Sequence, residues 1–178
     1  MRRYQPMWEN GQTVGPQERD AEGRYLAIAP YVPIGARVLD FGAFTGYFSH
    51  RLADERNADC LAVAPEALPH YGIKTINRTL NADELRALGR FDVALGLSVL
   101  HHCEPWQDYF DALCDAAETV IVEVPHREEW FHHCPAEKVA AIFDGVQGEV
   151  ICETLGYQGV LLRPTVLVKG RLPAPGGS

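Results

Sequence analysis

Residues 38–49 read VLDFGAFTGYFS, and this stretch decides the fold. Together with Arg37 it begins as a short, mostly apolar run over residues 37–41 that contains one acid, Asp40, which is typical of a buried strand. Gly42 and Gly46 follow, where the backbone must turn sharply and a ligand can approach it closely. From Tyr47 to Arg56 the pattern is helical. The stretch therefore predicts a strand, a tight turn and a helix, with bare backbone in the turn against which a cofactor can sit.

Short apolar runs and helical patterns alternate along the rest of the chain. A helix is expected over residues 21–31, before the first strand. Further strands are predicted over residues 60–64, 73–76, 91–97 and 119–124, and further helices over 66–70, 82–88, 106–117 and 135–143. Two final strands, 149–154 and 161–169, have no helix between them, which predicts a hairpin at the edge of the sheet. The alternation as a whole predicts a parallel α/β sheet.

The length and composition predict one domain with unstructured ends. The chain has 178 residues, of which 47% are apolar, enough for one sizeable core. Residues 1–20 are rich in Gln, Gly, Pro and Glu and are expected to form a flexible arm. Residues 171–178 are rich in Pro and Gly and are expected to be a disordered tail. The domain itself is predicted to span residues 21–170.

Charge and cysteine usage argue against several classes of protein. The net charge of −8 argues against a broad nucleic-acid-binding surface, which needs clustered Lys and Arg. The five cysteines form no CxxC pair of the kind found in zinc or redox sites, so reduced thiols in the cytoplasm are the simpler interpretation. No stretch approaches the roughly 20 apolar residues of a membrane helix, and no secretory leader is recognisable. A cytoplasmic protein without membrane or nucleic-acid partners is expected.

The turn resembles the first motif of class I S-adenosylmethionine-dependent methyltransferases, which reads hydrophobic-hydrophobic-Asp-x-Gly-x-Gly-Thr-Gly. The resemblance continues through residues 91–102, FDVALGLSVLHH, which look like the family's fourth strand and the loop after it. In all it spans residues 36–170. It implies an α/β fold with a Rossmann-like, doubly wound sheet of seven strands, mostly parallel, with a terminal antiparallel hairpin.

The resemblance also implies S-adenosylmethionine as the cofactor, and it locates the residues that would contact it. The turn borders the methionine part, residues after the third strand border the adenine, and residues after the fourth strand line the pocket. The expected residues are Asp40, Gly42, Ala43, Phe44, Thr45 and Gly46 at the turn, Asn81, Ala82 or Asp83 for the adenine, and Leu97 and Ser98 for the pocket beyond the fourth strand.

The sequence departs from the family pattern at two positions. Phe44 replaces the middle glycine, so the turn must accommodate a side chain, which is interpreted as a feature of a subfamily. Ala64 stands where the family has an acid that binds both ribose hydroxyls, and Glu66 is the candidate substitute. Without a substitute, the loss of this charge-assisted partner costs about 1.5–3 kcal/mol of binding.

The leading functional hypothesis is methyl transfer to an oxygen, nitrogen or carbon nucleophile on a small or medium-sized acceptor molecule. Such catalysis can work largely by holding the acceptor in line with the methyl group. His101 and His102 follow the fourth strand, where the acceptor would meet the methyl group, and are candidate general bases because a histidine pKa lies near neutrality. The chain contains no inserted cap domain, so a second subunit could complete the site in a homodimer.

Three other functions stay open. A regulatory or cofactor-binding module without activity is suggested by Ala64 and Phe44. A tRNA-modifying methyltransferase is suggested by the aromatic residue in the turn, but the acidic balance counts against it. A nicotinamide dehydrogenase is the remaining alternative, although the spacing after Asp40 fits the Gly-x-Gly-x-x-Gly fingerprint poorly.

Two further segments contain residues of chemical interest. The tripeptide His-His-Cys occurs at 101–103 and again at 132–134, a set of ligands that suits zinc or copper, but adjacent side chains usually point apart and no metal site is expected. Residues 128–131, Glu-Glu-Trp-Phe, are interpreted as a solvated turn with two aromatic residues in the core, with a lid over the substrate as the alternative. Arg19 could pair with the methionine carboxylate, or belong to an arm without such a role.

Overall fold

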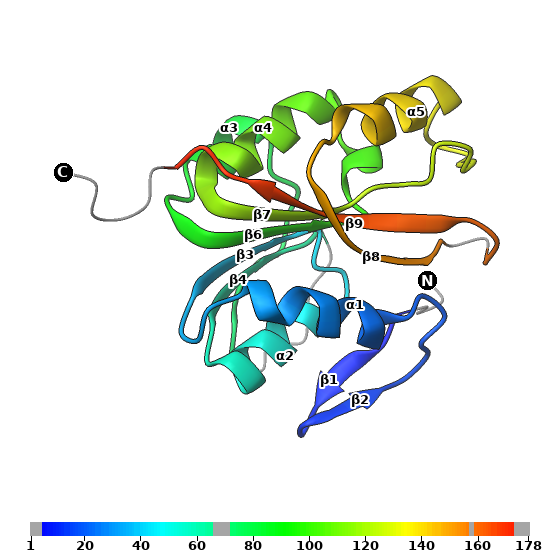
Figure 1. Cartoon of the computed structure of the whole chain (residues 1–178). Helices are drawn as coiled ribbons and strands as arrows, with labels where there is room; N and C mark the ends of the chain where they lie inside the picture. The colour runs from blue at the N-terminus through cyan, green and yellow to red at the C-terminus, as the bar shows by residue number, and fades with distance from the viewer. Residues whose placement is uncertain (1–4, 66–71, 157–158, 173–178) are drawn as a thin grey trace.

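A computed structural model describes residues 5–65, 72–156 and 159–172 of the chain. Within these ranges the main sheet has seven strands in the order β5-β4-β3-β6-β7-β9-β8 (Figure 1). Strands β5, β4, β3, β6 and β7 run parallel, and β9 pairs antiparallel with β7 and with β8. The strands are β3 (Arg37–Phe41), β4 (Asp59–Val63), β5 (Lys74–Ile76), β6 (Phe91–Leu97), β7 (Ala117–Glu123), β8 (Glu149–Leu155) and β9 (Leu162–Lys169).

Helices cover both faces of the sheet. On one face lie α1 (Ala21–Ile28) and α2 (Tyr47–Arg56), and on the other lie α3 (Ala82–Arg86), α4 (Trp106–Ala116) and α5 (Ala136–Gly145) (Figure 1). The segments η1 (Ala29–Tyr31) and η2 (Leu100–His102) are short 3-10 helices. The α/β, Rossmann-like, doubly wound fold with a terminal hairpin is thereby confirmed.

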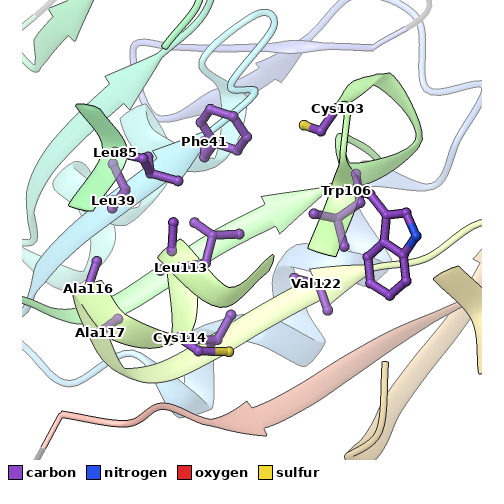
Figure 2. Close-up of a cluster of buried hydrophobic side chains, with 14 of the residues drawn as sticks. Leu39, Phe41, Leu85, Cys103, Trp106, Leu113, Cys114, Ala116, Ala117 and Val122 are labelled. Atoms are coloured by element: carbon purple, nitrogen blue, oxygen red, sulfur yellow. The ribbon is translucent and has the colours of Figure 1, made fainter. Parts of the chain in front are cut away.

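The two helical layers rest on two separate apolar clusters. Successive side chains of a strand point to opposite faces, so Val38 packs against α1 and α2 while Leu39 packs against α3 and α4. Figure 2 shows the cluster beneath α3 and α4, which contains Leu39 and Phe41 of β3 and Leu113 of α4. Because both faces are covered, the central strands are largely apolar and do not alternate between apolar and polar residues.

The predicted bounds hold best next to the glycine turn. Strand β3, helix α2 and strand β6 begin and end at the residues that the sequence pattern indicates. Strands β4 and β7 begin one and two residues earlier than predicted, and the helix expected over residues 66–70 lies outside the described residues. None of the described helices has the length and apolar character that crossing a lipid bilayer requires.

Residues 7–14 form an antiparallel hairpin where the sequence predicts a flexible arm. Its strands are β1 (Met7–Glu9) and β2 (Gln12–Val14). The Trp8 ring lies edge-on to Tyr47 of α2 at 6.4 Å, and its Nε1 donates to Asp54 at 2.9 Å. Strands of three residues are too short for an alternating pattern to be read, which is why the sequence does not indicate them.

The start of the predicted tail is also attached to the domain. The backbone N–H of Arg171 donates to the Cys114 carbonyl at 2.7 Å, and its guanidinium pairs with Asp111 and Asp115 of α4. Residues 173–178 lie outside the described ranges. The ordered chain therefore continues beyond the predicted boundary at residue 170.

Candidate functional site

The strand order reverses between β3 and β6. Strand β3 pairs with β4 on one side and with β6 on the other, all parallel. In open α/β sheets, ligands bind outside the carboxyl ends of the strands at such a reversal. The turn after β3 and the loop after β6 meet here, because a Cβ added to Gly42 would lie 2.6 Å from Val99 Cγ2. The predicted turn residues and the loop that contains Ser98 and the histidines are therefore neighbours.

The turn itself is held by backbone hydrogen bonds and by left-handed residues. Gly42, Phe44 and Gly46 have φ values of 83°, 50° and 72°. The N–H groups of Gly42 and Ala43 both donate to the Val63 carbonyl of β4, at 2.9 and 3.0 Å. Phe44 thus adopts a conformation that favours glycine and costs other residues about 1–2 kcal/mol. The turn therefore accommodates the Phe44 side chain, which the sequence places where the family pattern has a glycine, by holding Phe44 in the left-handed region.

Thr45 and Asp40 tie the turn to its surroundings. The Thr45 hydroxyl donates to the Pro6 carbonyl at 2.7 Å, which joins the turn to the segment before the hairpin. Asp40 is buried and accepts a hydrogen bond from the Ser49 hydroxyl of α2 at 2.6 Å. Burial raises the pKa of Asp40 to about 6, against an ordinary value of 3.8. Asp40, the penultimate residue of β3, therefore holds the first turn of α2 and titrates near neutrality.

The titration of Asp40 leads to a prediction for stability. A carboxyl with a raised pKa binds its proton more tightly in the folded state, so its stabilising contribution is complete below pH 3.8 and is lost as the pH rises through 6. In the ligand-free protein, Asp40→Asn should therefore gain stability relative to the unmodified chain, and that gain should grow by about 1 kcal/mol from pH 5 to pH 7. Urea denaturation at both pH values measures the difference. An equal gain at pH 5 and 7, or the same trend in the exposed-acid variant Asp144→Asn, would contradict this origin.

The position predicted to contact the ribose is occupied by Ala64, which lies in an apolar environment. Ala64 is buried, its N–H donates to the Ile76 carbonyl at 3.1 Å, and with Ala43 and Ala62 it forms a small apolar cluster on which Ile73 packs. Glu66, the candidate substitute, lies outside the described residues.

Asn81, predicted to border the adenine, caps a helix. Its side-chain oxygen accepts from the N–H of Glu84 at 2.8 Å, and the Glu84 carboxylate accepts from the N–H of Asn81 at 2.9 Å. This reciprocal pair is a capping box at the start of α3. Ala82 is the first residue of α3 and packs against the cluster shown in Figure 2. The capping signal, Asn followed by Glu three residues later, is readable in the sequence.

Glu123, at the end of β7, is the centre of a buried ionic network. It accepts from Arg19 and from Arg24, both at 2.5 Å, and all three side chains are at most 3% exposed. Burial by itself raises the pKa of Glu123, but the charges of Arg24 and Arg19 outweigh it and hold that pKa below its ordinary value. Arg19 thus pairs with a carboxylate of the chain itself.

A second buried pair joins this network through Ser98. Arg163 of β9 donates to both oxygens of Glu129 at 2.6 Å. Ser98 accepts from Arg19 at 2.9 Å and from Arg163 at 2.8 Å, and it donates to Glu123 at 2.7 Å. The interpretation of Glu129 as part of a solvated turn is therefore wrong, because its charge is paired inside the protein. Three guanidinium groups face two carboxylates, which leaves one net positive charge.

The two predicted pocket residues at the end of β6, Leu97 and Ser98, both make contacts inside the protein. Ser98 has a φ of 56°, and its hydroxyl belongs to the network of Glu123 and Arg163. The Leu97 side chain is buried in the cluster beneath α1 and α2. The one feature of the sequence that could have indicated the network is Glu123, an acid at the end of a β-branched strand. A carboxylate buried there requires a charged or hydrogen-bonding partner.

His101 and His102 lie in η2, immediately after Val99. Burial lowers the pKa of His101 to about 2 and that of His102 to about 4. Both imidazoles are therefore neutral at pH 7 and are weak proton acceptors. The expectation that adjacent rings point apart is wrong here, because their centroids are 4.2 Å apart.

No family model matches the chain, and no curated protein has a matching sequence. Solved structures do match. The bifunctional kinase-methyltransferase WbdD aligns with a TM-score of 0.60 and 24% identity. The alignment covers 82% of this chain and 37% of the WbdD chain. The Burkholderia thailandensis 1,6-didemethyltoxoflavin-N1-methyltransferase, solved with 1,6-didemethyltoxoflavin and S-adenosylhomocysteine bound, aligns with a TM-score of 0.54 and 18% identity over 85% of this chain and 81% of that one.

A putative methyltransferase from an antibiotic biosynthesis pathway of Anabaena variabilis gives a TM-score of 0.50 and 22% identity over 57% of this chain and 44% of that one. At these identities the likeness concerns the fold. The chain has the class I methyltransferase fold, as the turn and its flanking elements predicted.

Proposed function

We propose that this chain binds S-adenosylmethionine at the turn of residues 42–46 and transfers its methyl group to a small or medium-sized acceptor. The observation that carries the proposal is the turn at the strand-order reversal, where left-handed residues join the carboxyl end of β3 to the first turn of α2. The toxoflavin methyltransferase, which shares the fold over most of both chains, was solved with S-adenosylhomocysteine.

The residues present fit the two ends of the cofactor unequally. Gly42 and Gly46 have the left-handed backbone that a close approach to a ligand needs, and with Asp40 they would hold the methionine part. Ala64 offers no side-chain hydrogen bond to the ribose, so Glu66 is proposed for that role. Asn81 and Ala82 are proposed to border the adenine with the start of α3, and Leu97 and Ser98 to border the pocket beyond β6.

Bound cofactor supplies a methyl group that its sulfonium already activates. The chain then has to orient an acceptor and exclude water, and positioning accounts for much of the rate in such reactions. His101 and His102 follow β6, on the side where the acceptor would meet the methyl group, and they are the candidate bases. Since both have lowered pKa values, we propose that they orient the acceptor more than they deprotonate it. We propose further that the acceptor is a small molecule rather than a nucleic acid. A second copy of the chain could complete the site in a homodimer.

The alternative is a module that binds the cofactor without turnover. Ala64 at the ribose position is the observation that favours it. The two functions differ in one product, since only an enzyme forms S-adenosylhomocysteine.

The test incubates the chain with S-adenosylmethionine and pooled small phenols, amines and activated carbon acids, and measures S-adenosylhomocysteine by mass spectrometry. We expect more than one equivalent per chain with at least one acceptor class, and loss of that product in Asp40→Ala. Tight cofactor binding with no product from any class would favour the inactive module instead.

A further inference from the structure

We propose that His101, His102 and His133 form a three-imidazole site for a divalent transition-metal ion such as Zn²⁺. One ligand nitrogen from each ring lies within 4.8 Å of the other two. The ring centroids of His102 and His133 are 4.5 Å apart, and those of His101 and His133 are 5.8 Å apart. Two of the rings come from η2 and the third from the segment before α5, and His102 and His133 are 31 residues apart in the sequence.

The local fold brings these segments together. The Phe131 ring stacks on His101 with centroids 4.4 Å apart, and Arg163 lies over its ring, with the guanidinium carbon 5.2 Å from the centroid. Phe131 and Cys134 form an isolated antiparallel bridge, which makes the chain reverse at His133. Residues 131–134 therefore present His133 to η2 as part of a constrained turn.

His101 provides a second, independent observation. Its side chain is only 4% exposed, and in the described part of the chain its Nδ1 has no hydrogen-bond partner. Buried polar atoms in folded proteins are almost always paired with protein, water or an ion. Coordination of a metal by this ring would give a role to a buried imidazole whose Nδ1 has no partner in the described residues.

The donor set indicates the class of ion. Neutral imidazoles suit zinc, copper and nickel, and three histidines with an open fourth position are a known arrangement for catalytic zinc. Tetrahedral ligation with Zn–N distances near 2.0–2.1 Å needs nitrogens about 3.4 Å apart. The stacked rings of His102 and His133 must therefore tilt toward a common point. Both side chains are exposed, which leaves them room to do so.

Of the two His-His-Cys tripeptides, the first contributes both of its histidines to this cluster and the second contributes only His133. The thiol of Cys103 donates to the Val99 carbonyl and that of Cys134 to the Pro135 carbonyl. The His132 ring packs edge-on against Trp130, with centroids 4.1 Å apart. The cluster is thus made of nitrogen donors, and His132, next in the chain to a proposed ligand, is a matched control.

Calorimetric titration of the chelator-treated full chain with Zn²⁺ tests the site. We expect one ion per chain, with affinity weakened at least about 100-fold in His133→Ala and in His102→Ala, since even partners outside the coordination shell are worth 10–100-fold. His132→Ala should bind like the unmodified chain. Circular dichroism checks that each variant is folded, and Co²⁺ in place of Zn²⁺ should give visible d–d bands without a thiolate charge-transfer band.

Failure of the unmodified chain to bind Zn²⁺ would overturn the proposal, as would equal affinity in His133→Ala or equal loss in His132→Ala. The site is independent of the cofactor proposal, because S-adenosylhomocysteine binding is measured separately. Zn²⁺ binding without S-adenosylhomocysteine binding would remove only the proposed function.

Discussion

Replacing Glu123 with glutamine is expected to destabilise the protein by about 3–5 kcal/mol, the usual cost of removing one partner from a buried ion pair. Glu123 is fully buried and accepts from both Arg19 and Arg24. Glutamine has almost the same shape but no charge, so two buried guanidinium groups would lose their shared counter-charge. Urea denaturation at pH 7 measures the change in the free energy of unfolding.

Asp144→Asn is the matched control for this substitution. Asp144 pairs with Arg127 at 3.0 Å, but both side chains are about half exposed. Exposed pairs contribute about 0–1 kcal/mol, so this variant should unfold almost like the unmodified chain. A loss below about 1 kcal/mol in Glu123→Gln would mean that the network is not a buried, mutually dependent set of charges.

Gly42→Ala is expected to destabilise the protein by about 2–5 kcal/mol, from two additive causes. The left-handed backbone costs an alanine about 1–2 kcal/mol. The new Cβ would also lie 2.6 Å from Val99, and such overpacking costs about 1–3 kcal/mol more. The same substitution should weaken S-adenosylmethionine binding, because relieving the contact shifts the turn. Thermal and urea denaturation measure the first effect.

Two variants separate the causes. Gly35 has a similar φ of 74°, but an added Cβ there has no heavy atom within 4 Å, so Gly35→Ala should cost only the backbone term. Adding Val99→Ala to Gly42→Ala should recover part of the lost stability, because it removes the overlapping methyl groups. If Gly35→Ala and Gly42→Ala are equally destabilising, the turn after β3 and the loop after β6 are not in van der Waals contact at Gly42 and Val99.

The fold was predictable where its signals are local. In β3, the turn and α2, the apolar run, the glycines and the helical period all fall within 20 consecutive residues, from Arg37 to Arg56. Strand β6 is recognisable for the same reason, because the run from Val93 to Leu97 has no polar residue. The hairpin of residues 7–14 was not predictable, since its strands are shorter than any readable period.

The buried charges were not predictable because their partners are distant in the sequence. Arg19 and Glu123 are 104 residues apart, and Arg163 and Glu129 are 34 apart. Nothing in the run Glu128-Glu129 distinguishes the acid that is exposed from the one that is paired. Only the order of the strands, which brings β9 beside β7, decides which charges meet.

The histidine cluster was missed for a related reason. Adjacent side chains point apart in an extended strand or loop, but His101 and His102 lie in a 3-10 helix that the sequence did not indicate. The third ring, from His133, is brought in by a bridge between Phe131 and Cys134. The repeated tripeptide was visible, whereas the choice of which of its members meet depends on the fold.

The central claim is that the turn after β3 binds S-adenosylmethionine, and calorimetric titration with S-adenosylmethionine and S-adenosylhomocysteine tests it most directly. We predict micromolar binding of both, a free energy of about −8 kcal/mol, that is lost in Asp40→Ala and retained in Asp144→Asn. Absence of binding by the unmodified chain, or the same affinity in Asp40→Ala, would contradict the claim.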